Sequence, residues 1–79
     1  MILYFEDSKG QRRIISTPST VKEMWDDINH FLEGHNFKSP YSRVNFAGDE
    51  LIIDVGSHTE FFAVRNYTEE DSKAMFKGE

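Results

Sequence analysis

The chain has 79 residues and a net charge of −5, from 14 acidic and nine basic side chains, and it contains no cysteine. The negative charge argues against direct nucleic-acid binding, which depends on counterions displaced by basic groups. The lack of cysteine excludes disulfides and thiolate zinc sites. A chain of this length supports one domain, residues 1–79, which would bury only about 60% of the surface that its unfolded form exposes.

The N-terminus, Met1 to Asp7, has a short apolar run and no cationic leader. Such a segment is too short to span a membrane and lacks the leader of a signal peptide. We therefore expect a soluble cytoplasmic protein with no membrane partner, in keeping with the lack of cysteine.

A β-hairpin is predicted first, with strands at Ile2 to Glu6 and Arg12 to Ser16. Gly10 between them supplies the positive φ that a tight turn needs. A two-residue Lys9-Gly10 loop would form two cross-strand ion pairs, each contributing about 0.2–1 kcal/mol. The pairs would be Asp7 with Arg12, and Glu6 with Arg13.

A helix is expected from Val21 to Gly34. Thr20 and Glu23 match the S/T-x-x-E pattern of a capping box, in which hydroxyl and carboxylate bond the first free amides. Gly34 is placed to terminate the helix. Apolar side chains recur at spacings of three and four, and this stripe predicts the buried face. Its members are Val21, Met24, Trp25, Ile28, Phe31 and Leu32.

Three further strands are predicted at 42–46, 51–55 and 60–66, joined by tight turns at Gly48-Asp49 and Ser57-His58. Both turns place apolar residues on one face, which supports an antiparallel meander because a one-residue slip would invert the pattern. The apolar face carries Val44, Phe46, Leu51, Ile53, Phe62 and Val64. The opposite face carries Arg43 opposite Asp54, Glu50 opposite Arg65, and also Asn45, Ile52, Phe61 and Ala63.

These elements predict an α+β fold in the order β-β-α-β-β-β: a five-stranded, mainly antiparallel sheet with one amphipathic helix on one face. Thr68 precedes an acidic run that is typical of a helix start, so 69–76 is expected to form a short C-terminal helix or a frayed tail.

One helix covers only one side of a sheet, so the second sheet face needs another explanation. Either the C-terminal helix, with Met75 and Phe76, folds over it, or it meets a partner through an apolar centre with a charged rim. The partner-binding residues would be Arg43, Ile52, Asp54, Phe61 and Arg65.

An acidic helix face is the alternative partner-binding surface, formed by Glu23, Asp26, Asp27 and Glu33. Such a face is ordinarily solvated. In an acidic protein it would also mimic the phosphates of a nucleic acid and inhibit a host nucleic-acid-binding enzyme by occupying its basic cleft.

Catalytic or metal chemistry would have to use the three histidines with Asp54 and Glu60. His30 and His35 are five residues apart and so share no helical face, which excludes the i, i+4 zinc motifs. Ser57 beside His58 is explained by turn chemistry and lacks a G-x-S-x-G elbow. We expect no enzyme, metal or cofactor, and a small hydrolase or metal protein using His58, Asp54 and Glu60 is the third alternative.

The runs 31–39 and 53–62, within His30 to Val64, resemble small uncharacterised proteins encoded by phages, prophages and plasmids of Gram-positive bacteria. The resemblance implies an accessory factor of a mobile element and assigns no catalytic residue. We therefore expect a small non-enzymatic protein-interaction module that acts through a protein partner or by self-association.

Overall fold

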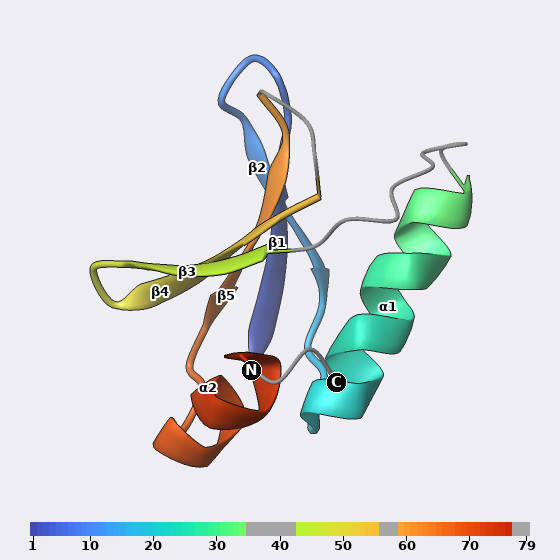
Figure 1. Cartoon of the computed structure of the whole chain (residues 1–79). Helices are drawn as coiled ribbons and strands as arrows, with labels where there is room; N and C mark the ends of the chain where they lie inside the picture. Colours follow the sequence, from blue (N-terminus) through green and yellow to red (C-terminus); the bar gives the residue numbers. More distant parts are fainter. Residues whose placement is uncertain (35–42, 56–58, 77–79) are drawn as a thin grey trace.

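A computed structural model, which describes residues 1–34, 43–55 and 59–76, confirms the α+β fold (Figure 1). Its five strands form one sheet in the order β2-β1-β5-β4-β3, and every neighbouring pair is antiparallel. The elements are β1 (Ile2–Glu6), β2 (Arg12–Ser16), α1 (Val21–Gly34), β3 (Arg43–Ala47), β4 (Glu50–Asp54), β5 (Phe61–Arg65) and α2 (Glu69–Phe76).

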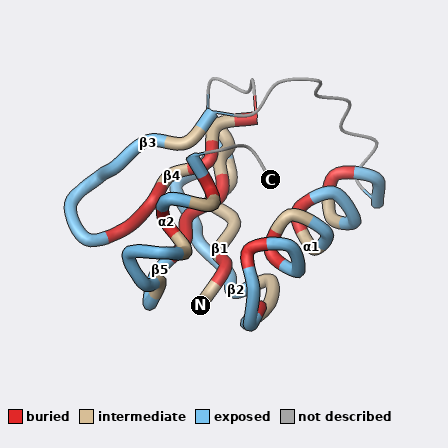
Figure 2. The backbone as a smooth tube through the Cα atoms, turned by 60° about the horizontal axis from the view of Figure 1, so that its bottom comes forward, coloured by how far each residue is buried: buried red, intermediate tan, exposed pale blue. Residues whose placement is uncertain are grey.

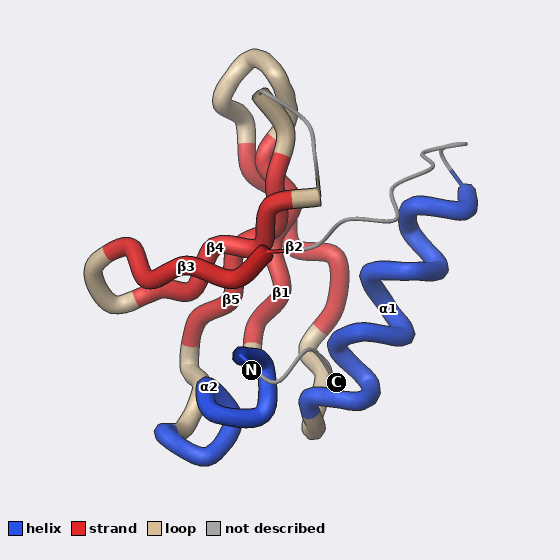
Figure 3. The backbone as a smooth tube through the Cα atoms, in the orientation of Figure 1, coloured by secondary structure: helices blue, strands red, loops and turns tan. Residues whose placement is uncertain are grey.

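The last strand, β5, lies in the middle of the sheet, between β1 and β4 (Figure 3). It therefore joins the N-terminal hairpin to the second hairpin, and β2 and β3 become the two edges. The register of the meander is the predicted one: Val44 pairs with Ile53, Phe46 with Leu51, Ile53 with Phe62, and Leu51 with Val64. The predicted turn at Ser57-His58 lies outside the described residues.

The turn between β1 and β2 is longer than predicted. The Asp7 carboxylate accepts the backbone N–H groups of Lys9 at 2.9 Å and Gln11 at 3.0 Å, and Gly10 has a φ of 79°. These bonds close a three-residue loop, because the Asp7 N–H also donates to the Gln11 carbonyl. Asp7 therefore builds the turn.

The predicted ion pairs of this hairpin are wrong by one residue. Glu6 pairs with Arg12, and Phe5 pairs with Arg13. Because side chains alternate between the two faces of a strand, this slip sends the two arginines to the faces opposite those predicted. Arg12 joins Glu6 on the face without helices. Arg13 turns toward α1, where its guanidinium lies 5.3 Å from the centre of the Phe31 ring.

Both helices begin where the capping patterns predict. The Thr20 hydroxyl accepts the Glu23 N–H at 3.1 Å, and the Glu23 carboxylate accepts the Ser19 N–H at 3.1 Å. At α2, Thr68 and Asp71 exchange two such bonds, at 3.0 and 3.1 Å. The C-terminal segment is thus a helix and not a frayed tail.

Both helices pack on the same face of the sheet, so the first of the two alternatives for the second face, in which α2 covers Ile52 and Phe61, is wrong. Met75 of α2 is fully buried in the cluster that contains Leu51 and Val64. The Phe76 ring lies 5.0 Å from the ring of Phe46, on the same sheet face. Met75 and Phe76 contact the apolar face of the meander. The helix α1 covers only part of that face, and α2 packs on the rest.

The helix stripe is buried as predicted: Met24 and Ile28 are almost inaccessible, and Val21 and Leu32 are buried, while Trp25 and Phe31 are half-buried against them. Figure 2 shows buried and exposed residues alternating along α1, and a largely exposed β3. No helix in the described part of the chain is both long and apolar enough to cross a membrane.

Candidate partner-binding face of the sheet

The face turned away from α1 and α2, called the open face below, is organised in rows that the strand register aligns. One row runs across all five strands and alternates in charge around a central aromatic ring: Arg12, Glu6, Phe61, Asp54 and Arg43. The next row is mostly apolar: Ile14, Tyr4, Ala63, Ile52 and Asn45.

The structure brings all five predicted partner-binding residues together on this face. Ile52, Asp54 and Phe61 are half-buried, and Arg43 and Arg65 are exposed. They come from three neighbouring strands, β3, β4 and β5, whose backbone pairing fixes their spacing. A rigid sheet of this kind presents its side chains with little loss of conformational entropy on contact.

A network of four charged side chains, Glu6, Arg12, Glu50 and Arg65, crosses the open face. Arg12 donates two parallel bonds to Glu50, from Nη1 to Oε2 at 2.8 Å and from Nη2 to Oε1 at 2.7 Å. Its Nε donates to Glu6 Oε1 at 2.7 Å. Arg65 Nε donates to Glu50 Oε2 at 2.9 Å. Glu50 is therefore held between two guanidinium groups.

This arrangement shifts the acidity of the groups that form it. The hydrogen bonds from Arg12 lower the pKa of Glu50 from 4.5 to about 2, more than burial raises it, and the bond from Arg65 acts in the same direction as Arg12. The bonds to Glu50, and then to Glu6, raise the pKa of Arg12. Glu50 and the two arginines that hold it are therefore charged at neutral pH.

The network also reports the shape of the sheet. The register aligns Arg12 with Asp54, yet its guanidinium binds Glu50, four residues away along β4. Three strand spacings in a flat sheet would span roughly 14 Å, and four residues along a strand a further ~13 Å. The twist of the sheet must therefore bring the part of β2 that carries Arg12 toward the part of β4 that carries Glu50. The open face is concave along the line that joins these two residues.

Side chains of the network and of the neighbouring row cover the concave part of the face. Ala63 is fully buried although no helix lies over it, because Tyr4 and Ile52 flank it in its row. Arg12 also lies over the Tyr4 ring, at 5.9 Å from its centre. The exposed side chains of the face include Arg43, Arg65 and Ile14, which is 60% exposed, and Phe61 is half-buried.

Sequence reasoning missed most of this network. It predicted the Glu50–Arg65 pair, which the 2.9 Å bond confirms, but it assigned Arg12 to Asp7. A three-residue loop at 8–10 would have revealed the Glu6–Arg12 pair. The Arg12–Glu50 pair joins residues 38 positions apart, and it depends on strand order and curvature that no local pattern encodes.

The acidic residues of α1 are largely used within the chain. Glu23 caps the helix through Ser19, Asp26 lies 3.0 Å from the Lys22 ammonium, and Asp27 accepts the Ser16 hydroxyl at 2.7 Å. Asp27 is turned toward β2, whereas Asp26 and Glu33 point outward as exposed residues. These four acids do not form one continuous outward array.

The residues considered for catalysis are not gathered into a described site. His58 and His35 lie outside the described residues, His30 is exposed on α1, and Asp54 lies on the open face. Within ranges 1–34, 43–55 and 59–76, no group of three or more His, Asp or Glu side chains is placed to hold a metal ion.

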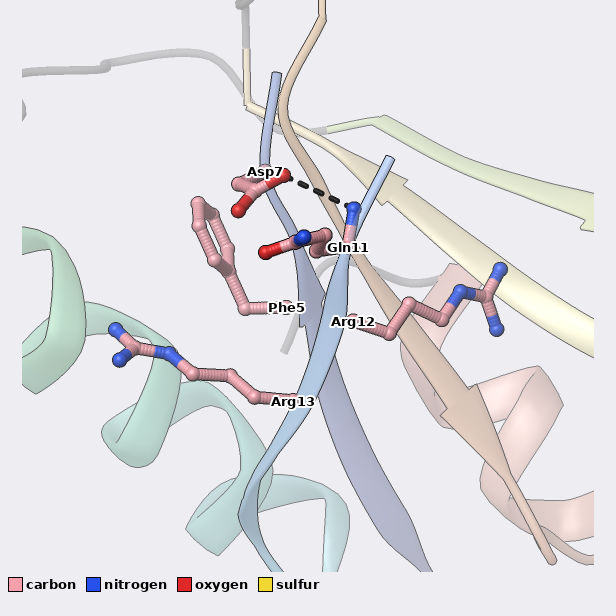
Figure 4. A pocket seen from close by; sticks show the side chains of 5 residues that line it. All are labelled: Phe5, Asp7, Gln11, Arg12 and Arg13. Carbon is pink, nitrogen blue, oxygen red and sulfur yellow. Dashed lines mark hydrogen bonds between the residues drawn. The ribbon is translucent and has the colours of Figure 1, made fainter. Parts of the chain in front are cut away.

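A pocket of about 400 Å³ lies beside the β1–β2 turn and is lined by Phe5, Asp7, Gln11, Arg12 and Arg13 (Figure 4). Arg13 extends toward α1, and Arg12 extends to the other side of the hairpin. Most of its polar groups already have partners: Asp7 in the turn, Arg12 in the network and Arg13 over Phe31. The pocket therefore results from the shape of the turn, and its polar groups are not arranged to bind a ligand.

Comparison of the chain with models of known protein families, with curated proteins and with solved structures gave no match.

Proposed function

We propose that this protein is a small non-enzymatic interaction module whose open sheet face contacts a protein partner. The observation that carries the proposal is the row across the five strands, in which Phe61 lies between the carboxylates of Glu6 and Asp54. A half-buried aromatic ring within a frame of charges has the composition of a protein interface.

The roles within the face follow from its chemistry. Phe61 and Ile52 supply apolar area, and hence affinity. Arg43 and Asp54 give the contact its register, because misaligned partners would meet like charges. The ion-pair network holds the sheet in its curved shape, so that little ordering is needed on binding.

We further propose that the protein is an accessory factor of a phage or another mobile element. This part rests on the resemblance of residues 31–39 and 53–62 to small proteins of such elements. Those proteins imply a binding role, in agreement with the open face, and the partner is then expected to be a protein of the host or of the element.

The nucleic-acid mimic ranks second. Three of its four acids already bond Ser19, Lys22 and Ser16. Capping and local pairing therefore explain these three without a partner.

The test compares partner recovery by variants of equal charge. Ile52→Lys/Phe61→Lys alters the open face, and Asn29→Lys/His30→Lys adds the same two side chains to exposed positions of α1. Each variant, after its fold is checked by circular dichroism and thermal melting, is used as bait in quantitative affinity mass spectrometry. Loss of a specific prey with the first bait and its retention with the second supports the proposal. Equal recovery with both baits would refute it.

A further inference from the structure

The sheet has a second accessible surface at its β3 edge, on the side of the helices. Phe46 of β3 is 62% exposed and Phe76 of α2 is 47% exposed, and their rings lie 5.0 Å apart. They line a pocket of about 480 Å³ together with Glu69, Ser72 and Lys73. These two are among the three large apolar side chains exposed in the described part of the chain.

The backbone beside this pocket belongs to an edge strand. Four of the five residues of β3 are exposed, and among the described strands it pairs on one side only, with β4. An edge strand offers a row of N–H and C=O groups that another strand can pair with. Backbone pairing and a neighbouring pocket together are the components of recognition by strand addition.

The other edge, β2, is protected against such pairing. It carries two adjacent arginines, Arg12 and Arg13, and both are tied into contacts with the rest of the sheet and α1. Its register with β1 is also irregular between Leu3 and Tyr4, and irregular, charged edges resist strand addition. The strand β3 has no such irregularity along its five pairs with β4.

We propose that the β3 edge is a self-association site at which β3 pairs antiparallel with β3 of a second copy of this chain. A pairing centred on Asn45 would set Val44 of each copy beside Phe46 of the other. The same pairing brings Arg43 of one copy next to the turn that carries Asp49 on the other. The surface is thus complementary to itself in its apolar side chains and its charges, as a two-fold symmetric contact requires.

The apolar part of this site is separate from the proposed function, because Phe46 and Phe76 lie on the helix side of the sheet and Phe61 lies on the open face. Arg43 belongs to both surfaces. Pairing at β3 would continue the sheet from one copy into the next. It would leave Ile52 and Phe61 of the open face accessible in each copy.

The experiment measures molar mass by light scattering as concentration rises to about 1 mM, where even a contact of −4 kcal/mol is half-formed. The mass should rise from 9.2 kDa toward twice that value. Phe46→Lys should weaken the association at least tenfold. Ile14→Lys is the matched control, since Ile14 is equally exposed on the opposite edge, and it should leave the association unchanged.

A charge exchange tests the pairing without touching the aromatic rings. Arg43→Asp and Asp49→Arg should each weaken the association, and the double variant should restore it, since each new charge again meets its opposite across the two-fold axis. A constant mass of 9.2 kDa at every concentration, an association insensitive to Phe46→Lys, or no restoration in the double variant would overturn the proposal.

Discussion

Arg12 and Glu50 are 38 residues apart in the sequence and on strands separated by two others, yet they share two hydrogen bonds of 2.8 and 2.7 Å. The pair joins the two hairpins across the concave side of the sheet. It fixes the curvature of the open face, and Glu50, with a side chain only 11% exposed, is its centre.

The pair should make stability depend on pH in the acid range. The pKa of Glu50 is lowered in the fold to about 2 from 4.5, so its contribution is complete above about pH 4.5 and is lost as the pH falls toward 2. The loss should amount to at most about 3 kcal/mol. Urea unfolding between pH 2 and 6 measures it.

Glu50→Gln should flatten that acid dependence and lower the stability at pH 6. Asp49→Asn is the control, because Asp49 is an exposed neighbour, and it should keep the parent profile. An unchanged acid profile in Glu50→Gln would show that the network contributes nothing to stability.

Arg12→Lys should destabilise the protein by about 1–2 kcal/mol, because an ammonium cannot donate two parallel bonds to one carboxylate. Arg13→Lys is the matched control. It retains a cation near the Phe31 ring and should cost less than about 0.5 kcal/mol. Chemical denaturation at pH 7 compares them, and equal costs for the two variants would argue against the special role of Arg12.

Phe31 packs between Phe5 and Phe62, with ring centres 4.6 and 5.6 Å away. Phe31→Ala should therefore cost about 3 kcal/mol, a large share of the stability of a domain this small. The exposed neighbour His30 provides the control, because His30→Ala should melt within a few degrees of the parent. A comparable melting temperature for Phe31→Ala would mean that α1 is not anchored to the sheet by this ring.

Local patterns predicted the elements well, because the signals were local. The capping residues Thr20 and Thr68 marked both helix starts, and Gly48, with a φ of 67°, marked the turn that set the register of β3 and β4. Two turns agreeing on one apolar face then identified the open face before its shape was known.

The errors arose where the outcome depends on the whole molecule. Asp7 could have served as an ion-pair partner or as a turn builder, and the sequence does not rank these roles. The position of Met75 depends on how much of the sheet α1 leaves uncovered. Phe46 lies on the predicted apolar face but is exposed, because its strand became an edge.

We expect the protein to bind no zinc, since it has no thiolate and its histidines share no helical face. Native mass spectrometry with equimolar zinc checks this. A stoichiometric zinc adduct that disappears in His58→Ala would instead support the metal-protein alternative.

The most direct test of the open face is a nuclear magnetic resonance titration of the labelled protein with the partner recovered by affinity capture. The largest backbone shifts should fall on the open-face strands, around Arg43, Ile52 and Phe61, and α1 should remain unperturbed. Shifts concentrated around Asp26 and Glu33 of α1, with the sheet unchanged, would contradict the account and favour the acidic helix as the binding surface.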